Sequence, residues 1–408
     1  MISEAVEHTA SPLGLGVIGL GRAFMLTLPS ILADPRIRLA GATDPRAEAR
    51  AEFTARFDAP AHVTLADMLY DPAIEIVYVA SPHQYHRDQA IAALAAGRHV
   101  LVEKPVAVTL EESRAIIAAA ERYDRHVIVG PSHSFDPQIN AALDIVKSGD
   151  YGRLRLIRGS YYTDFMYRPR RAEELRTEAG GGVIFSQAAH HVDLVRLLAG
   201  GRTTRVAALT GNWDRARPTE GAYTALLTFE SGVIANLTYS GYAHYDGDEA
   251  AGWIGELGVR KNPADYGAAR RRLKNLASAE EEAALKNSRV FGVGAELPAV
   301  EGNEHFGDLM LSFDHADIRI LPNELRIYGE SAVTTQPILP AAAGRRLVME
   351  AIWRAARENH PPVQDARWGH ATLEVCQAML TSAASGCWEK LNEQVAVPGY
   401  PADHHSGE

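Results

Sequence analysis

A short apolar run interrupted by two glycines, LGVIGLGRAF at residues 15–24, constrains the fold more than any other stretch of the chain. Residues 15–18 predict a buried parallel strand, and Gly19 predicts the tight turn that follows it. Gly21 has no side chain, so the backbone there can approach a diphosphate. The helix that starts after it offers unpaired N–H groups and the positive end of its dipole. This pattern predicts the first strand, turn and helix of a nucleotide-binding sheet.

Asp44 follows a second predicted strand, at residues 38–42, in the position from which a carboxylate hydrogen-bonds the ribose hydroxyls of NAD. Its charge would repel the 2′-phosphate of NADP, so NAD is favoured, although Arg46 lies nearby. Phe24 stands where the third glycine of G-x-G-x-x-G is expected, and the glycine pair alone also fits any tight strand-to-helix turn. The spaced acidic residue favours the dinucleotide interpretation. The residues expected to contact the cofactor here are Gly19, Leu20, Gly21, Arg22, Ala23, Phe24 and Asp44.

An alternation of strands and helices continues beyond this turn. The apolar run IEIVYVA is typical of a parallel strand covered on both faces. Thr109 and Glu112 form a capping box at the start of a helix. The predicted strands are 74–80, 99–102 and 126–130, and the predicted helices are 46–57, 65–70, 87–96 and 109–121. We therefore predict that residues 1–130 form a Rossmann domain with a doubly wound parallel sheet that binds NAD.

The pattern changes after residue 130. Longer strands with alternating, β-branched and aromatic residues are predicted at 154–162, 205–209, 223–229 and 233–242, with a helix at 188–198 and a possible edge strand at 325–328. Residues 131–408 are thus expected to form an α+β domain with an open, mainly antiparallel sheet. Residues 264–288 read as a charged helical insertion, either solvated or functional. Two helices within 341–390 close the fold, and 290–323 show no clear period.

The composition of the chain limits the classes of function that it can have. The chain has 408 residues, 46% hydrophobic and 23% charged, with a net charge of -10, which argues against nucleic acid as a partner. No apolar run is long enough to span a membrane. The N-terminal residues show no secretory signal. The two cysteines, Cys376 and Cys387, suggest no disulfide framework. We expect a cytoplasmic enzyme.

Lys104 is the first candidate for chemistry, because it follows a predicted strand at the sheet edge where such folds bind ligands. Burial and a cationic nicotinamide would lower its pKa and let it exchange a proton with a substrate hydroxyl. The alternative is a surface lysine paired with Glu103. The loop after the preceding strand is also expected to face the cofactor. The candidate cofactor-binding residues of this loop are Ser81, Pro82, His83 and His86. Glu103 and Lys104, at the end of the predicted strand 99–102, are candidates as well.

A glycine run at 180–182 leads into a helix on which His190 and Asp193 share one face. His190 is a candidate general acid or base held by a neighbouring acid, whereas His191 points elsewhere. A single histidine on a helix is more often structural, so both interpretations stand at this point.

Three arginines, Arg168, Arg170 and Arg171, leave the first strand of the second domain in a loop after several aromatic residues. Arginines in such a loop grip carboxylates with two hydrogen bonds, and the alternative is a solvated basic loop. The candidate substrate-binding residues are these three with His133, Tyr162 and Asp193. His133 lies near Asp136, but histidine spacings typical of metal sites on one helix are absent, so we expect no metal.

Several of these motifs resemble those of the Gfo/Idh/MocA oxidoreductases, over about residues 13–245. They are the glycine pair with Asp44, the loop from Ser81 to His86, the tripeptide Glu103-Lys104-Pro105, and the glycine-rich segment before His190 and Asp193. The resemblance implies NAD(P)-dependent hydride transfer, usually on a sugar or polyol, in a cleft between two domains. It implies that Lys104 is catalytic with His190 as its acid–base partner. It also implies a homo-oligomer formed through the open sheet of the second domain.

Two positions depart from the family pattern. Ser186 stands where members often have an aspartate, and Ala188 where they have a glycine. That aspartate typically contacts a sugar hydroxyl, so a simple sugar is disfavoured. The segments ASPHQYH, YTDFMYRPRR, FSQAAHHVD and SGYAHYDGDE, with the insertion containing GWIGELG, resemble a narrower branch, the phthalate 4,5-cis-dihydrodiol dehydrogenases. This implies a dicarboxylated cyclohexadiene cis-diol oxidised to a catechol. The alternatives are a sugar or inositol dehydrogenase and a catalytically idle NAD-binding sensor.

Overall fold

The computed structural model describes residues 11–294, 297–340 and 344–401 and contains two β-sheets. The first sheet has six parallel strands in the order β3-β2-β1-β4-β5-β6. Its strands are β1 Leu13–Ile18, β2 Ile37–Thr43, β3 Ala61–His62, β4 Ile76–Val79, β5 His99–Val102 and β6 Val127–Val129. Its helices are α1 Arg22–Ala33, α2 Ala47–Phe57, α3 Leu65–Tyr70, α4 His86–Ala95 and α5 Leu110–Tyr123.

The Rossmann prediction is confirmed. Every residue of β1, β4 and β6 is buried, as expected for parallel strands covered on both faces. The capping box at Thr109 and Glu112 is present at the start of α5. The strand order reverses beside β1, and this switch point is where open parallel sheets bind their ligands. The carboxyl ends of β1, β4 and β5 therefore position the candidate site.

The second sheet has nine strands in the order β14-β13-β12-β11-β7-β10-β9-β8-β15. Only β7 and β10 pair in parallel, so the sheet is mixed and mainly antiparallel, as predicted. The strands before the insertion are β7 Leu154–Tyr162, β8 Thr203–Gly211, β9 Ala222–Phe229 and β10 Ile234–Ser240. The later strands are β11 Asp308–Phe313, β12 Ala316–Leu321, β13 Glu324–Gly329, β14 Val333–Pro337 and β15 Glu389–Lys390. A π-helical turn, Ile184–Ala188, runs into α7, Ala189–Leu198, and α6 is Pro137–Ser148.

One sequence expectation needs correction, and the structure adds detail to two further regions. The predicted edge strand at 325–328 is β13, but it is an inner strand because β14 pairs beyond it. Residues 290–323 contain β11 and β12, whose alternating buried and half-buried positions are too short to stand out without their partners. The insertion forms two helices, α8 Ala268–Lys274 and α9 Ala279–Asn287, because Ser278 starts a new helix by capping the backbone N–H of Glu281.

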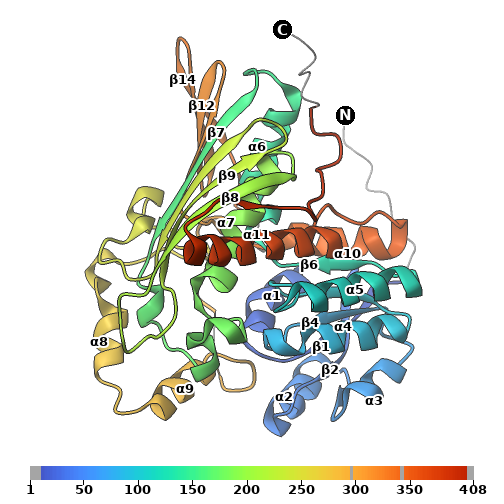
Figure 1. Ribbon diagram of the computed structural model, residues 1–408. Helices are drawn as coiled ribbons and strands as arrows, with labels where there is room; N and C mark the ends of the chain where they lie inside the picture. The colour runs from blue at the N-terminus through green and yellow to red at the C-terminus, as the bar shows by residue number, and fades with distance from the viewer. Residues whose placement is uncertain (1–10, 295–296, 341–343, 402–408) are drawn as a thin grey trace.

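The two closing helices, α10 Arg346–Glu358 and α11 Ala366–Ser385, lie between the two sheets (Figure 1). The buried face of α10, including Ile352 and Trp353, packs into the core of the first sheet beside α1. The longer α11 contacts both α5 and β8, so it joins the two halves of the molecule. The outer limits of the predicted domains, residues 1 and 408, lie outside the described residues. Within the described part of the chain, every helix is too short or too polar to cross a lipid bilayer.

Candidate active site

The turn after β1 is built for close approach of a ligand to the backbone. Gly19 has φ +89°, and a Cβ there would lie 3.0 Å from the carbonyl oxygen of Ala80, so only glycine fits. Gly21 is the N-cap of α1 and no side chain caps this helix, which leaves its first N–H groups available. The turn therefore fits a dinucleotide diphosphate. Ala23 and Arg22 line the adjacent cavity.

Asp44 occupies the predicted position, but its carboxylate is already hydrogen-bonded. Its Oδ2 accepts from the backbone N–H of Leu20 at 2.8 Å, and its Oδ1 accepts from the backbone and Nε of Arg46 at 2.9 and 3.0 Å. The Arg46 side chain therefore lies against the carboxylate that a ribose would approach. The Phe24 side chain is buried between Phe53 and Phe291, so it faces the core and not the ligand, which corrects its prediction as a contact residue.

The loop after β4 is fastened by a buried histidine. His86 contacts the carbonyl oxygens of Pro105 and Ser81 through its two ring nitrogens, at 2.9 and 3.0 Å. His86 thus joins two strand-end loops and does not itself face the cavity. His83 and Pro82 line a second cavity of about 560 Å³ with the glycine run, Gly180–182. Burial, followed by the nearby His86 and Lys104, lowers the pKa of His83 to about 3, so this imidazole is neutral.

Lys104 lies directly beyond β5, and its Nζ donates to the carbonyl oxygen of Ser186 at 2.9 Å. Burial lowers the pKa of Lys104 below its usual range. The neighbouring Glu103 accepts a hydrogen bond from the Tyr78 hydroxyl at 2.6 Å and does not pair with Lys104. Lys104 is therefore a half-buried amine held by one carbonyl, which is the environment expected of an amine that exchanges protons.

His190 lines the same cavity as Lys104, and this cavity has a volume of about 690 Å³. Burial and then the charge of Lys104 lower the pKa of His190 well below its usual range, so the imidazole is neutral. Its Nδ1 is buried and has no hydrogen-bond partner among the described residues. Lys104 and His190 thus line one cavity, and their convergence on a nicotinamide ring stays a prediction. His191 points elsewhere, as expected, and contacts the Tyr223 hydroxyl at 2.8 Å.

Asp193 does not hold His190. Its carboxylate accepts hydrogen bonds from the Ser132 hydroxyl and the Trp368 indole N–H, and the residue is only 5% exposed. The i and i+3 spacing correctly placed Asp193 near one face of α7 but could not show these partners from other segments. Asp193 orients the helix on which His190 stands.

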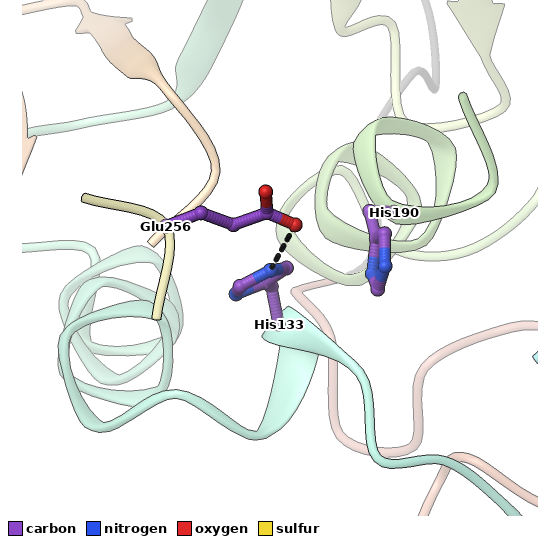
Figure 2. A group of neighbouring side chains, drawn as sticks. All are labelled: His133, His190 and Glu256. Carbon is purple, nitrogen blue, oxygen red and sulfur yellow. Dashed lines mark ion pairs between the residues drawn. The ribbon is translucent and has the colours of Figure 1, made fainter. Parts of the chain in front are cut away.

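His133 and Glu256 lie beside His190, and the rings of the two histidines are 4.7 Å apart between centroids (Figure 2). His133, after β6, contacts Asp136 through Nδ1 at 2.7 Å and lies 4.0 Å from Glu256 through Nε2. Burial lowers the pKa of His133, but the two carboxylates outweigh it and raise the pKa to about 10. Burial raises the pKa of Glu256, but His133 and Arg168 outweigh it and lower the pKa to about 2. The pair is a charged imidazolium and carboxylate.

The same side chains have the donor atoms of a metal site. The ligand atoms of His133, His190 and Glu256 lie within 4.8 Å of one another. However, His133 holds protons on both nitrogens under the influence of its carboxylates, and Lys104 adds a positive charge nearby. A cation would have to displace the proton and approach that charge. The expectation of no metal therefore remains our prediction.

The three loop arginines separate in the structure. Arg168 lies 3.8 Å from Glu256, beside the main cavity. Arg170 stacks 3.5 Å from the centre of the Phe165 ring and lies 3.6 Å from Glu174. Arg171 donates to the side chain of Asn287 on α9 at 2.8 Å. Arg170 and Arg171 are used by the protein itself and line the second cavity, so the predicted three-arginine carboxylate grip is not assembled.

Tyr162 also lies away from the cavity. It is 37% exposed on β7 and its ring faces Tyr245 at 6.1 Å, because successive residues of a strand point to opposite faces and Tyr161 is the buried one. The cavity residues that the sequence analysis missed are Glu256, Glu304 and Arg345. Arg345 donates to Glu304 at 3.2 Å and to Thr27 at 2.8 Å. For Glu256, the available signal was its place in the segment GWIGELG.

Comparison with known proteins identifies the family. Residues 13–131 match the model of an oxidoreductase family with an NAD-binding Rossmann fold, GFO_IDH_MocA, and residues 139–259 match the GFO/IDH/MocA C-terminal domain. The chain is 44% identical to 1-carboxy-3-chloro-3,4-dihydroxycyclohexa-1,5-diene dehydrogenase of Comamonas testosteroni, over 90% of this chain and 94% of that protein. The chain belongs to the Gfo/Idh/MocA oxidoreductases. It is an NAD(P)-dependent dehydrogenase.

Solved structures show the same fold. A dehydrogenase structure from Bordetella bronchiseptica RB50 is 37% identical, with a TM-score of 0.88, and covers 93% of this chain and 100% of its own. Levoglucosan dehydrogenase in complex with NADH and levoglucosan is 20% identical, with a TM-score of 0.71 over 93% of this chain and 100% of its own. The cavity that Lys104 and His190 line is formed by residues of both matched domains.

Proposed function

We propose that this dehydrogenase oxidises a carboxylated cyclohexadiene cis-diol to a catechol, with NAD as the cofactor. The observation that carries the proposal is the cavity in which a half-buried amine and a neutral imidazole meet several cations. The identity to the Comamonas enzyme, whose name describes a carboxylated dihydroxycyclohexadiene, supports this substrate class. Ser186 in place of the usual sugar-binding aspartate favours it over a sugar or inositol.

The reaction removes a hydride from a carbinol carbon and a proton from its hydroxyl, which leaves a dienone that tautomerises to the catechol. NAD⁺, when bound at the turn after β1, would supply the hydride acceptor. Lys104 takes the hydroxyl proton in its neutral form, and its bond to the Ser186 carbonyl fixes the direction of Nζ. His190, also neutral, assists as a hydrogen-bond partner of the same hydroxyl. Because the product is aromatic, the protein has mainly to orient the diol and stabilise the developing alkoxide.

Carboxylate recognition falls to the cations that face the cavity. Arg22 and Arg345 line the cavity and Arg168 lies beside it. Arg168 pairs with Asp164 at 3.1 Å and lies 3.8 Å from Glu256, and Arg345 pairs with Glu304. Arg22 has no hydrogen-bond or ion-pair partner among the described residues. We assign carboxylate binding to Arg168, with His133 and Arg345 beside it. The dicarboxylated phthalate 4,5-cis-dihydrodiol remains the predicted substrate. The monocarboxylated diol is the compound whose turnover should be compared with it.

NAD is proposed over NADP because a 2′-phosphate would lie beside the Asp44 carboxylate. We also propose self-association through the open face of the second sheet and action in the cytoplasm. Apolar residues on that face are exposed, among them Leu156, Leu226 and Ile234, and Leu156 and Ile234 are direct neighbours across β7 and β10. Exposed apolar residues grouped in this way are typical of an interface.

The experiment follows absorbance at 340 nm with NAD⁺ and a panel that contains phthalate 4,5-cis-dihydrodiol, its monocarboxylated analogue, an uncarboxylated cis-diol, inositol and glucose. The proposal expects turnover of the carboxylated diols and a large loss of kcat/KM without a carboxylate. Turnover of inositol or glucose in preference to any diol would support the sugar dehydrogenase. An absence of turnover with every compound would support the NAD-binding sensor.

A further inference from the structure

The helical insertion that follows residue 263 has no role in the reaction described above, yet it is fixed firmly to the second domain. On α9, Glu282 accepts a hydrogen bond from the backbone of Arg170 at 2.6 Å and pairs with Arg217 at 2.8 Å. Lys286 pairs with Glu174 at 2.8 Å. These contacts hold the end of α9 in a defined place. They therefore also fix the position from which the chain continues after α9.

The chain that continues after α9 leads to the nucleotide-binding turn of the first domain. The backbone N–H of Phe291 donates to the carbonyl oxygen of Leu20 at 3.2 Å, and Arg46 donates to the carbonyl of Phe291 at 3.0 Å. The Phe291 ring is buried against Phe24 and stacks on Phe57. The segment directly after the insertion is thus bonded to Leu20, the residue between Gly19 and Gly21, at the point where the diphosphate of a dinucleotide is expected.

Two guanidinium groups flank this point of contact. Arg22 is two residues after Leu20, and Arg289 is two residues before Phe291. Neither side chain has a hydrogen-bond or ion-pair partner within residues 11–294, 297–340 and 344–401. Burial and then the charges of Arg289 and Arg345 lower the pKa of Arg22. Burial and then Arg272 and Arg168 lower the pKa of Arg289. Two half-buried guanidinium groups that repel one another, with no acid beside them, are suited to bind an anion.

We propose that Arg289, which follows the insertion directly, binds the diphosphate of NAD(P) together with Arg22 and the uncapped start of α1. The segment after the insertion thereby completes the cofactor site from the second domain. The diphosphate fits better than a substrate carboxylate, because the Leu20–Phe291 bond fixes Arg289 to the turn that receives the diphosphate. This role deepens the cofactor half of the proposed function and does not depend on which alcohol is oxidised.

The test is cofactor binding without substrate. We compare the dissociation constants of NAD⁺ for the wild-type protein and for the variants Arg289→Ala, Arg289→Lys and Lys274→Ala by titration calorimetry. Lys274 is the matched control, because it is an exposed cation of α8 with the same change in charge. We expect Arg289→Ala to weaken NAD⁺ binding about tenfold or more, Arg289→Lys to recover most of the loss, and Lys274→Ala to match wild type.

The second measurement identifies the group that is bound. ADP-ribose contains the diphosphate and adenosine does not, so Arg289→Ala should weaken ADP-ribose as strongly as NAD⁺ and leave adenosine unchanged. The proposal is overturned if Arg289→Ala binds NAD⁺ as wild type does, or if it loses adenosine to the same extent as ADP-ribose. A raised KM for the diol with unchanged NAD⁺ affinity would also overturn it and assign Arg289 to the substrate carboxylate. The protein could turn over none of the alcohols and still show the expected differences in NAD⁺ affinity among the variants. That result would refute the proposed function and would leave the role of Arg289 standing.

Discussion

Lys104 and Arg170 are both half-buried cations that the sequence offered as functional, and the structure uses them in opposite ways. Lys104 stands at the end of β5, contacts one carbonyl oxygen and opens onto the main cavity. Arg170 lies in the loop after β7, where Phe165, Glu174 and the Glu282 carboxylate surround it. A residue at a strand end has its position fixed by the sheet. A residue in a loop takes whichever partner the rest of the chain supplies.

The largest expected effect belongs to Lys104→Met. Loss of the proton acceptor should reduce kcat by about 10²–10⁴-fold, while the dissociation constant of NAD⁺ stays near the wild-type value. Steady-state kinetics and NAD⁺ titration measure the two quantities. Lys147→Met, at an exposed position of α6, is the control and should leave both unchanged. Full turnover by Lys104→Met would remove the amine from the reaction.

A smaller effect is expected from Glu256→Gln. The variant keeps the shape of the side chain but removes the charge that faces His133 and Arg168. We expect kcat/KM for the diol to fall about 10–100-fold, because charged partners in a buried site lose their compensation, while NAD⁺ affinity is retained. Kinetics at several diol concentrations separate KM from kcat. Unchanged kinetics would place Glu256 outside the substrate site.

Arg170→Met should affect stability more than activity. The substitution keeps an apolar stem beside Phe165 but loses the ion pair with Glu174, which should lower the free energy of unfolding by about 1–3 kcal/mol. The melting temperature should fall, and kcat/KM for the carboxylated diol should change less than about threefold. A large increase in KM with unaltered stability would restore the original prediction that Arg170 grips a carboxylate.

A further expected effect is a pH dependence of stability from His133. Its pKa in the folded protein, about 10, lies above its ordinary value of 6.5. The stabilisation is therefore complete below pH 6.5 and is lost as the pH rises through about 10. Thermal melts between pH 7 and 10 should show a decline that is shallower in His133→Gln. Parallel declines in both proteins would mean that another group titrates.

The fold was largely predictable because its signals are local. Thr109 and Glu112 are three residues apart, and the apolar strands of the first sheet are continuous, so both could be read directly. The sequence analysis did not predict β11 and β12, because their alternation of buried and half-buried residues is short and their burial depends on pairing with β7 and β13. The break between α8 and α9 depended on one capping serine.

The candidate site was predictable only in part. Lys104 and His190 follow from a strand end and a helix face. Glu256 and Arg345 line the cavity but lie in loops far along the chain from Lys104. Arg46 donates a hydrogen bond to the Asp44 carboxylate, which their spacing in the sequence does not reveal. Likewise, the partners of Asp193 are Ser132 and Trp368 from two other segments. Pairings over such sequence distances require the structure.

The most direct test of the convergence of Lys104 and His190 is the pH profile of kcat/KM for the carboxylated diol in wild type and Lys104→Met. Because the amine must be neutral to accept a proton and burial lowers its pKa, wild-type kcat/KM should rise with pH and level off below the ordinary lysine pKa of 10.5. Lys104→Met should lose this rising limb together with most of its activity. The same rising limb at near wild-type rates in Lys104→Met would contradict the account.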